Sequence, residues 1–220
     1  IAGVVSLDSI DYLIVNHVEP DHFGGLLDVI DALPNAQLVC SAAAARTIPE
    51  FHGVDLKPTI VSDGSTIDLG GKTLHFLPVP MVHWPDSMFT YVPESKTLLP
   101  NDAFGQHIGV PGSNFADEVG ADRVWHAMDL YYANILMALH GPIRTAIQKV
   151  TAKGWEVETI APSHGVVFRG EWVAQVLDHY GQLIAGPDDG SITIAYSTAW
   201  HSTEIMAEKV AERLSDCGVE

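Results

Sequence analysis

The chain has 220 residues, 47% of them hydrophobic, which is enough for one full domain with its own core and part of a second. Its 28 acidic residues against 11 Lys and Arg give a formal net charge of −17, and such a surface repels phosphate backbones and anionic membranes, which excludes nucleic acid and membrane partners. The start of the sequence does not have the pattern of a signal peptide, and no apolar run reaches the ~18 residues that a spanning helix needs. Two cysteines, Cys40 and Cys217, are too few for a disulfide scaffold, so free thiols in a reducing cytoplasm are expected.

The first half of the chain has the pattern of a layered α/β protein. A short apolar run at residues 12–15 predicts a buried strand, and a helical pattern follows at 26–30. A second strand at 37–40 is closed by an Ala-rich helix at 42–46. Gly- and Pro-containing turns then separate four further strands, which we expect at residues 66–69, 73–79, 88–92 and 97–99.

The second half is mainly helical up to a predicted linker at residues 187–190. Helices are expected at 122–139, from Pro142 onward, and through Val173 to Ile184, with a strand at 158–161 between them. Beyond the linker, Ile192, Ile194 and Tyr196 predict a strand, and a helix follows that carries Ala207, Val210, Ala211 and Leu214 on one face. A lone strand–helix unit cannot bury its own faces, and Ile1 is no initiator Met, so we expect a chain truncated at both ends.

The strongest chemical signal is the segment His17-Val18-Glu19-Pro20-Asp21-His22, directly after the first predicted strand. His17, Glu19 and Asp21 alternate, so an extended backbone would direct all three to one side, and Pro20 disfavours helical geometry at Glu19. His22 faces differently but stays within reach of the same pocket as the chain turns into its helix. The segment therefore predicts several metal ligands in one place.

Three more candidate ligands, His83, Asp102 and His164, also follow strands, each in a turn that contains Pro or Gly. The whole set offers three or four imidazoles and three carboxylates, enough for two metals. Asp102 is the natural bridge because a carboxylate has two oxygens for two ions. Mixed imidazole and carboxylate ligands without sulfur suit iron, manganese or zinc, and hard oxygen ligands stabilise the ferric state of a redox-cycling pair, so iron is favoured.

Each of these residues has a plainer interpretation when taken alone. A histidine at a strand end is commonly a satisfied polar residue, Asp102 could cap a turn, and Asp21 could be a helix N-cap. Without metal, however, several buried charges would stay unpaired together, each at a cost of several kcal/mol. The complete set therefore favours metal binding.

In this order the candidate ligands resemble the ligand series of flavodiiron proteins, a family with the metallo-β-lactamase fold. The neighbouring segments 81–88, 101–107 and 131–134 match as well, and Glu19 stands where zinc hydrolases of the same fold have His. The resemblance runs from about residue 11 to the end. It implies an αββα sandwich with its N-terminal part missing over residues 1–187, and the first βα unit of a flavodoxin-like domain over 190–220.

The resemblance also implies roles for individual residues. His17, Glu19 and His83 would bind one iron, Asp21 and His164 the other, and Asp102 would bridge the two. Relatives differ on whether the position of His22 ligates iron or yields to water. His107 matches no ligand position, and Trp84 is expected to pack near the site.

A second site is implied near the C-terminal end. One segment resembles the loop that binds the FMN phosphate in flavodoxin-like domains: Ser197, Thr198, Ala199, Trp200, His201, Ser202, Thr203. Hydroxyls and free backbone N–H groups at a helix N-terminus bind a phosphate dianion without Lys or Arg, which suits so acidic a chain. Taken alone, a Ser/Thr-rich turn before a helix is commonly only a cap.

The function implied by the resemblance is a cytoplasmic oxidoreductase that reduces O2 to water or NO to N2O at two iron ions, with electrons relayed by FMN. Rubredoxin or a reduced deazaflavin would be the electron donor, and two copies would form a head-to-tail homodimer. Two alternatives stay open. A dinuclear zinc hydrolase is opposed by Glu19 and by the FMN-like loop, and a non-catalytic electron-transfer module is opposed by the intact ligand set.

Overall fold

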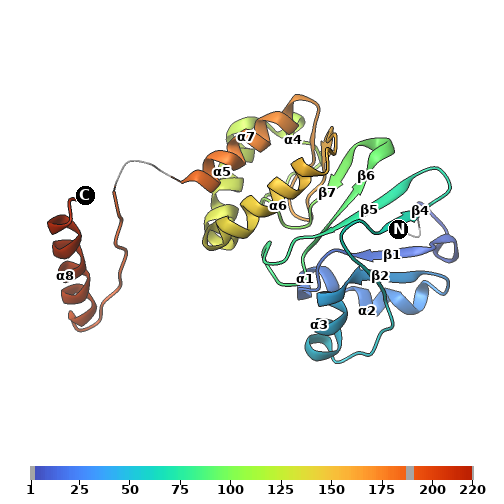
Figure 1. The fold of residues 1–220 in the computed structure, drawn as a ribbon, viewed down its shortest axis with the longest axis horizontal. Coiled ribbons are helices and arrows are strands. Elements are labelled where there is room, and N and C mark those ends of the chain that lie inside the picture. The colour runs from blue at the N-terminus through green and yellow to red at the C-terminus, as the bar shows by residue number, and fades with distance from the viewer. Residues whose placement is uncertain (1–2, 187–190, 220) are drawn as a thin grey trace. The chain divides into compact units, whose positions relative to one another are not determined.

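Two β-sheets lie at the centre of the first of two units in the computed structural model, which describes residues 3–186 and 191–219 (Figure 1). Within these residues the smaller sheet has three parallel strands in the order β1-β2-β3, and the larger has six in the order β4-β5-β6-β7-β8-β9. The strands are β1 (Tyr12–Val15), β2 (Gln37–Ser41), β3 (Thr59–Val61), β4 (Thr66–Asp68), β5 (Thr73–Pro78), β6 (Met88–Val92), β7 (Thr97–Leu99), β8 (Thr159–Ile160) and β9 (Phe168–Arg169).

Helices cover the outer face of each sheet (Figure 1). The smaller sheet packs against α1 (Pro20–Phe23), α2 (Leu26–Val29) and α3 (Ala42–His52). The larger sheet packs against α4 (Ala116–Val119), α5 (Ala121–Tyr131), α6 (His140–Ala152) and α7 (Glu171–Ala185). The expected αββα sandwich is confirmed.

The alternation of side chains along the strands builds the layers. In β2, Leu38 and Cys40 pack toward the helices, whereas Val39 between them packs toward the other sheet. In β6, Met88 joins Val39 in the layer between the sheets, and Phe89 points to the opposite side, toward the helices of the larger sheet. All five residues of β6 are buried, because this central strand is covered on both faces.

The end of β1 is fastened to the start of β6. The carbonyl of Asn16 accepts a hydrogen bond from the backbone N–H of Met88 at 2.9 Å, and the Asn16 side chain accepts one from Thr90 Oγ1 at 2.7 Å. These bonds join the end of β1 in the smaller sheet to β6 in the larger sheet. They bring the segment after β1 beside the loop that precedes β6.

Several elements differ from the sequence-based expectation. Strands β3 and β9 were not predicted individually, because runs of three and two residues show no period that a pattern could reveal. The helix expected at 122–139 is α-helical only to Tyr131 and continues as a π-helical segment, Tyr132–Leu136, and a 3-10 turn, Met137–Leu139. The π-helical segment accompanies two adjacent buried tyrosines, Tyr131 and Tyr132.

The second unit, Ala185–Glu220, contains helix α8 (Ser202–Asp216). The strand expected at Ile192, Ile194 and Tyr196 is wrong: residues 191–200 form no strand, and Ile192 and Tyr196 are exposed. A strand needs a neighbour for its backbone hydrogen bonds, and the described part of this unit supplies none. The predicted linker at 187–190 lies outside the described residues, and the assignment of 190–220 to a flavodoxin-like domain stays a prediction.

In the described parts of both units, helices long and apolar enough to cross a membrane are absent.

Candidate metal centre

The segment after β1 is extended only as far as Glu19. Glu19 has a ψ of 148°, and α1 begins at Pro20, whose fixed φ suits the first position of a helix. The expectation that Asp21 continues the extended alternation is therefore wrong, because Asp21 and His22 both belong to α1. His17 and Glu19 instead form a pair, with His17 Nε2 3.1 Å from Glu19 Oε2.

One group of side chains surrounds the Oδ2 atom of Asp102. His83 Nε2 lies 3.2 Å from this oxygen and 3.2 Å from Glu19 Oε2. His17 Nε2 lies 3.6 Å from the same Asp102 oxygen. Three loops, those after β1, β5 and β7, thus bring His17, Glu19 and His83 to one side of Asp102.

A second group surrounds the other oxygen, Oδ1. His22 Nε2 lies 3.1 Å from it and His164 Nε2 3.3 Å from it. Asp21 completes this group, with Oδ2 3.2 Å from His164 Nε2 and Oδ1 3.6 Å from His22 Nε2. The structure therefore brings together all seven candidate ligands, and Asp102 turns one oxygen toward each group.

The spacing of these atoms fits metal ligation. Two ligands that each bind one ion at about 2.1 Å lie roughly 3.0–3.4 Å apart when they subtend 90–110° at the metal. Most of the contacts above, from 3.1 to 3.3 Å, fall in that range. Among the described residues, His22 Nε2 and Asp102 Oδ1 are buried without a hydrogen-bond partner although they lie 3.1 Å apart. A cation would bind at the point where the lone pairs of such atoms converge. Since each oxygen of Asp102 faces its own group of side chains, the residues fit a pair of ions.

The electrostatics of the site centre on Asp102, which is fully buried. Burial acts to raise the pKa of Asp102, but the imidazoles of His164, His22 and His83 outweigh it and hold that pKa well below its usual range. The pKa of His17 is raised, because Asp86, Asp102 and Glu19 outweigh the opposing effect of burial. The carboxylates likewise raise the pKa of His164, Asp102 first among them. Imidazole and carboxylate groups thus stabilise one another's charged forms, and the site opens to solvent on the side of Asp21.

Asp86 is a residue of the site that the sequence-based reasoning missed. Its Oδ2 atom accepts hydrogen bonds from His17 Nδ1 at 2.8 Å and from the backbone N–H of Val18 at 2.9 Å. This contact leaves Nε2 of His17 as the atom that faces Glu19 and Asp102. The available signal was its place in segment 81–88, three residues after His83.

Gln106 and Asn101 were also missed, and they join the loop of Asp102 to the loop of His164. The backbone N–H of Gln106 donates to the His164 carbonyl at 3.2 Å, and Gln106 Oε1 accepts from the N–H of Val166 at 2.8 Å. Asn101 Nδ2 donates to Asp102 Oδ2 at 3.2 Å, and Asn101 Oδ1 accepts from Ser163 Oγ at 3.1 Å. The two loops therefore hold their candidate ligands as one unit.

Trp84 and His107 border the centre. The Trp84 ring packs edge-on against His17, with centroids 5.1 Å apart, in agreement with the expected packing position. The His107 ring is exposed and lies 5.6 Å from the ring of His164 and 4.7 Å from that of Tyr131. Neither residue is among the side chains described above that surround the two oxygens of Asp102.

The segment expected to bind the FMN phosphate, residues 197–203, precedes and enters α8. The first backbone hydrogen bond of this helix runs from Ile205 N–H to the carbonyl of His201, which has a left-handed conformation. His201 Nδ1 lies 2.6 Å from Glu204 Oε2, and the Trp200 side chain is 88% exposed. FMN binding by this loop stays a prediction.

The fold and the paired ligand groups define a metallo-β-lactamase-like protein with a candidate dinuclear metal centre. The family model described as ODP family beta lactamase matches residues 1–165, and the chain belongs to that family.

The chain is similar to a nitric oxide reductase from Moorella thermoacetica, with 39% identity over 96% of this chain and 53% of the relative. It is 37% identical to an anaerobic nitric oxide reductase flavorubredoxin from Salmonella arizonae, over 96% of this chain and 44% of the relative. The chain thus spans about half the length of the curated relatives it matches.

Two solved structures show the same likeness. The rubredoxin oxygen:oxidoreductase from Desulfovibrio gigas superposes with a TM-score of 0.83 at 33% identity, over 99% of this chain and 55% of that one. The flavodiiron protein from Giardia intestinalis gives 0.80 at 34% identity, over 100% of this chain and 53% of that one. These relatives confirm the resemblance to flavodiiron proteins.

Proposed function

We propose that this chain forms the diiron part of an oxidoreductase that reduces O2 to water or NO to N2O. The observation that carries the proposal is the position of Asp102, whose two oxygens face two separate groups of imidazoles and carboxylates. The relatives that carry the names nitric oxide reductase and rubredoxin oxygen:oxidoreductase support this chemistry. Glu19 in place of a histidine favours iron over the zinc of hydrolases.

The proposed ligands follow the two groups. His17, Glu19, His83 and Asp102 Oδ2 would hold one iron, and Asp21, His22, His164 and Asp102 Oδ1 the other. When bound, the two ions would supply electrons and open positions to the gas. Asp102 would hold both ions close together, and Asp86 would keep Nε2 of His17 directed at its ion.

The reaction needs electrons and protons from outside the centre. Four electrons and four protons convert O2 to two waters, and two electrons and two protons convert two NO to N2O and one water. We propose that FMN, held at its phosphate by residues 197–203, relays the electrons from rubredoxin or a reduced deazaflavin. A head-to-tail homodimer would bring the flavin of one subunit to the centre of another. The relatives named flavorubredoxin and rubredoxin oxygen:oxidoreductase support the donor.

The test combines metal analysis with gas consumption by the full-length reduced protein. We expect two iron ions per chain and anaerobic consumption of NO, or consumption of O2. Asp102→Asn should lose more than about 100-fold of this activity, because the bridge supplies several kcal/mol of charge stabilisation. Asp129→Asn, which alters an Asp–His pair on α5 and α7, is the matched control and should keep the activity.

Two outcomes would contradict the proposal. Two zinc ions at full occupancy together with esterase activity would favour the dinuclear hydrolase. Iron- and flavin-loaded protein that consumed neither gas would leave the electron-transfer module as the better description.

A further inference from the structure

A cavity lies on the helical side of the larger sheet, with a volume of about 490 Å³. Its floor is made by core side chains from β6, β7 and β8 and from the loop after β7: Phe89, Leu98, Ile160 and Phe104. Its mouth opens between α6 and α7, where Leu177 and Gly181 lie. The cavity therefore runs from the surface to the buried apolar core. The polar side chains in its lining are Thr151, whose hydroxyl donates to the Ile147 carbonyl at 3.0 Å, and Trp155.

Gly181 lines the mouth of the cavity and places no side chain there. It stands in the interior of α7, where glycine is less favourable than alanine, because glycine loses more conformational freedom on folding. A Cβ atom added at Gly181 would meet nothing within 4 Å, and no left-handed φ requires glycine there. Neither packing nor backbone conformation requires this glycine, and its lack of a side chain leaves the cavity lining open at this position.

The floor of the cavity reaches the loop of the candidate metal centre. Phe104 follows Asp102 by two residues, and its ring packs against Tyr180 of α7, with centroids 4.4 Å apart. The backbone N–H of Phe104 donates to the Tyr180 hydroxyl at 3.2 Å. The same short loop thus presents Phe104 to the cavity and Asp102 to the ligand groups.

We propose that this cavity binds small apolar gas molecules and holds them beside the loop that carries Asp102. An apolar cavity binds uncharged, weakly hydrated molecules in preference to water, as engineered apolar cavities bind xenon. The identity of the gas as O2 or NO rests on the proposed function, but the binding of an apolar atom does not. The site would raise the local concentration of the gas next to the metal centre.

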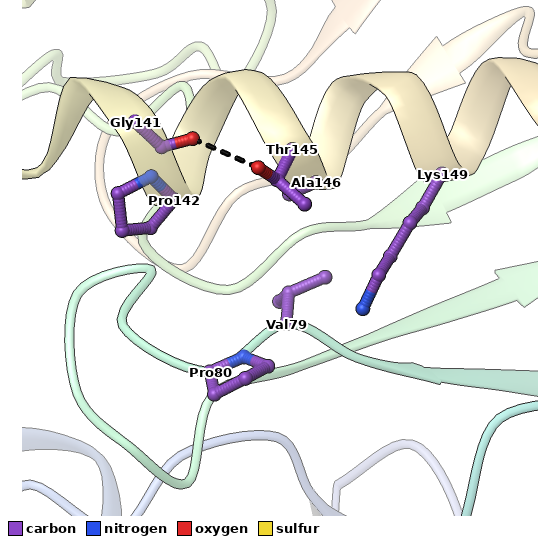
Figure 2. A pocket seen from close by; sticks show the side chains of 7 residues that line it. All are labelled: Val79, Pro80, Gly141, Pro142, Thr145, Ala146 and Lys149. Atoms are coloured by element: carbon purple, nitrogen blue, oxygen red, sulfur yellow. Dashed lines mark hydrogen bonds between the residues drawn. The ribbon is translucent and has the colours of Figure 1, made fainter.

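The cavity shown in Figure 2 provides an internal comparison. It has a volume of about 420 Å³ and lies between α6 and the end of β5. Lys149 extends into it, and Thr145 Oγ1 donates to the Gly141 carbonyl at 3.1 Å (Figure 2). Gly141 resembles Gly181, since a Cβ atom there also meets nothing within 4 Å. A substitution at Gly141 therefore tests the effect of a larger side chain on a different helix, away from the apolar cavity.

Xenon is the probe for the first test, by crystallography under xenon pressure or by 129Xe NMR of the metal-loaded protein. We expect xenon in the cavity of the unaltered protein and of Gly141→Leu, and its loss in Gly181→Leu, whose side chain fills the mouth. Gly181→Ala, which suits a helix better than glycine, should raise the thermal midpoint. It supplies a folded variant at the same position if Gly181→Leu fails to fold. Absence of xenon, or equal xenon binding in Gly181→Leu, would overturn the proposal.

The second test measures gas reduction by the full-length reduced protein. Gly181→Leu should raise KM for the gas severalfold with kcat unchanged at saturating gas, whereas Gly141→Leu should change neither. An unchanged KM despite lost xenon binding would overturn the role in gas supply. Xenon binding in a protein that consumes neither O2 nor NO would contradict the proposed function but not the proposed binding site. Failure of the function and failure of the binding site are therefore distinguishable.

Discussion

At the scale of single residues, the centre depends on buried carboxylates that act on histidines. Asp86 contacts His17 through Nδ1 and is as buried as its partner. Such a contact sets the ring orientation and raises the basicity of the opposite nitrogen. Asp86 therefore positions a ligand without facing the metal groups itself.

Asp86→Asn keeps the shape of the side chain and removes its charge. We expect the affinity for metal to fall about 10- to 100-fold, because the ring of His17 is held less firmly and its Nε2 is less basic. Competition with a chelator of known affinity measures the change. Asp129→Asn removes the charge from the Asp129–His179 pair and should leave metal affinity as it was. Equal affinity in Asp86→Asn and the unaltered protein would contradict the positioning role.

Cys40 predicts a dependence of stability on alkaline pH. Burial, with a smaller effect from Asp86, raises the pKa of the Cys40 thiol from 9.0 to about 11. Between these values the folded state binds more protons than the unfolded state, so stability falls as pH rises through that window, by roughly 2–3 kcal/mol at most. Urea unfolding at pH 8 and pH 11 measures the fall.

The matched variants separate Cys40 from the other groups that titrate in the same window. Cys40→Ala should show a smaller loss of stability between the two pH values, whereas Cys217→Ala, which removes the exposed thiol, should behave as the unaltered protein. The same dependence in all three proteins would rule out Cys40 as its source.

At the scale of elements, the ligands sit on loops whose conformations are held by their neighbours. The loop after β8 carries His164 and passes against Gln106 of the loop after β7 at Gly165. Gly165 has a φ of +87°, and a Cβ atom there would overlap the side chain of Gln106 and lie 2.7 Å from its carbonyl. Glycine is required here for both conformation and space.

Gly165→Ala should therefore destabilise the fold and displace His164. We expect a loss of more than about 2 kcal/mol in the free energy of unfolding, since the left-handed conformation alone costs roughly 1–2 kcal/mol. Gly64→Ala is the control, because Gly64 has nearly the same φ, +85°, with nothing within 4 Å. Urea unfolding and metal stoichiometry of both variants give the comparison, and equal losses would show that the contact with Gln106 is unimportant.

At the scale of the whole molecule, the two units differ in how well they are buried. Helix α7 of the first unit buries four residues, Val173, Val176, Tyr180 and Ile184. Of the residues of α8, all of them described, only Ala207 is buried, while Ile205, Met206 and Val210 are exposed. A 15-residue helix with so little packing is marginal in water.

In a protein of these 220 residues alone, backbone amides of α8 should therefore exchange with solvent at least about 100-fold faster than those of α7, because local opening requires much less free energy. Hydrogen exchange followed by mass spectrometry measures both helices in one experiment, with α7 as the internal control. Comparable protection of α8 would mean that another part of the assembly covers its apolar side, and would contradict this expectation.

Much of the fold was predictable because its strands carry strong local patterns. The strands at 12–15, 88–92 and 97–99 were predicted with the bounds that the structure shows, since apolar runs between turn residues mark them. The strand at 192–196 was wrong for the opposite reason: its pattern is adequate, but no neighbour pairs with it in the described chain. Local pattern cannot supply a partner.

The sequence by itself determined which side chains are candidate ligands, because donor chemistry and a position after a strand are local properties of His17, Glu19, His83, Asp102 and His164. The resemblance already assigned His17, Glu19 and His83 to one ion and Asp21 and His164 to the other. The tertiary structure alone decided that His22 lies with Asp21 and His164, on the side of Asp102 Oδ1. It likewise decided that Asp86 contacts His17 across 69 residues of chain. These arrangements depend on sheet register and on contacts between distant loops, which no local pattern encodes.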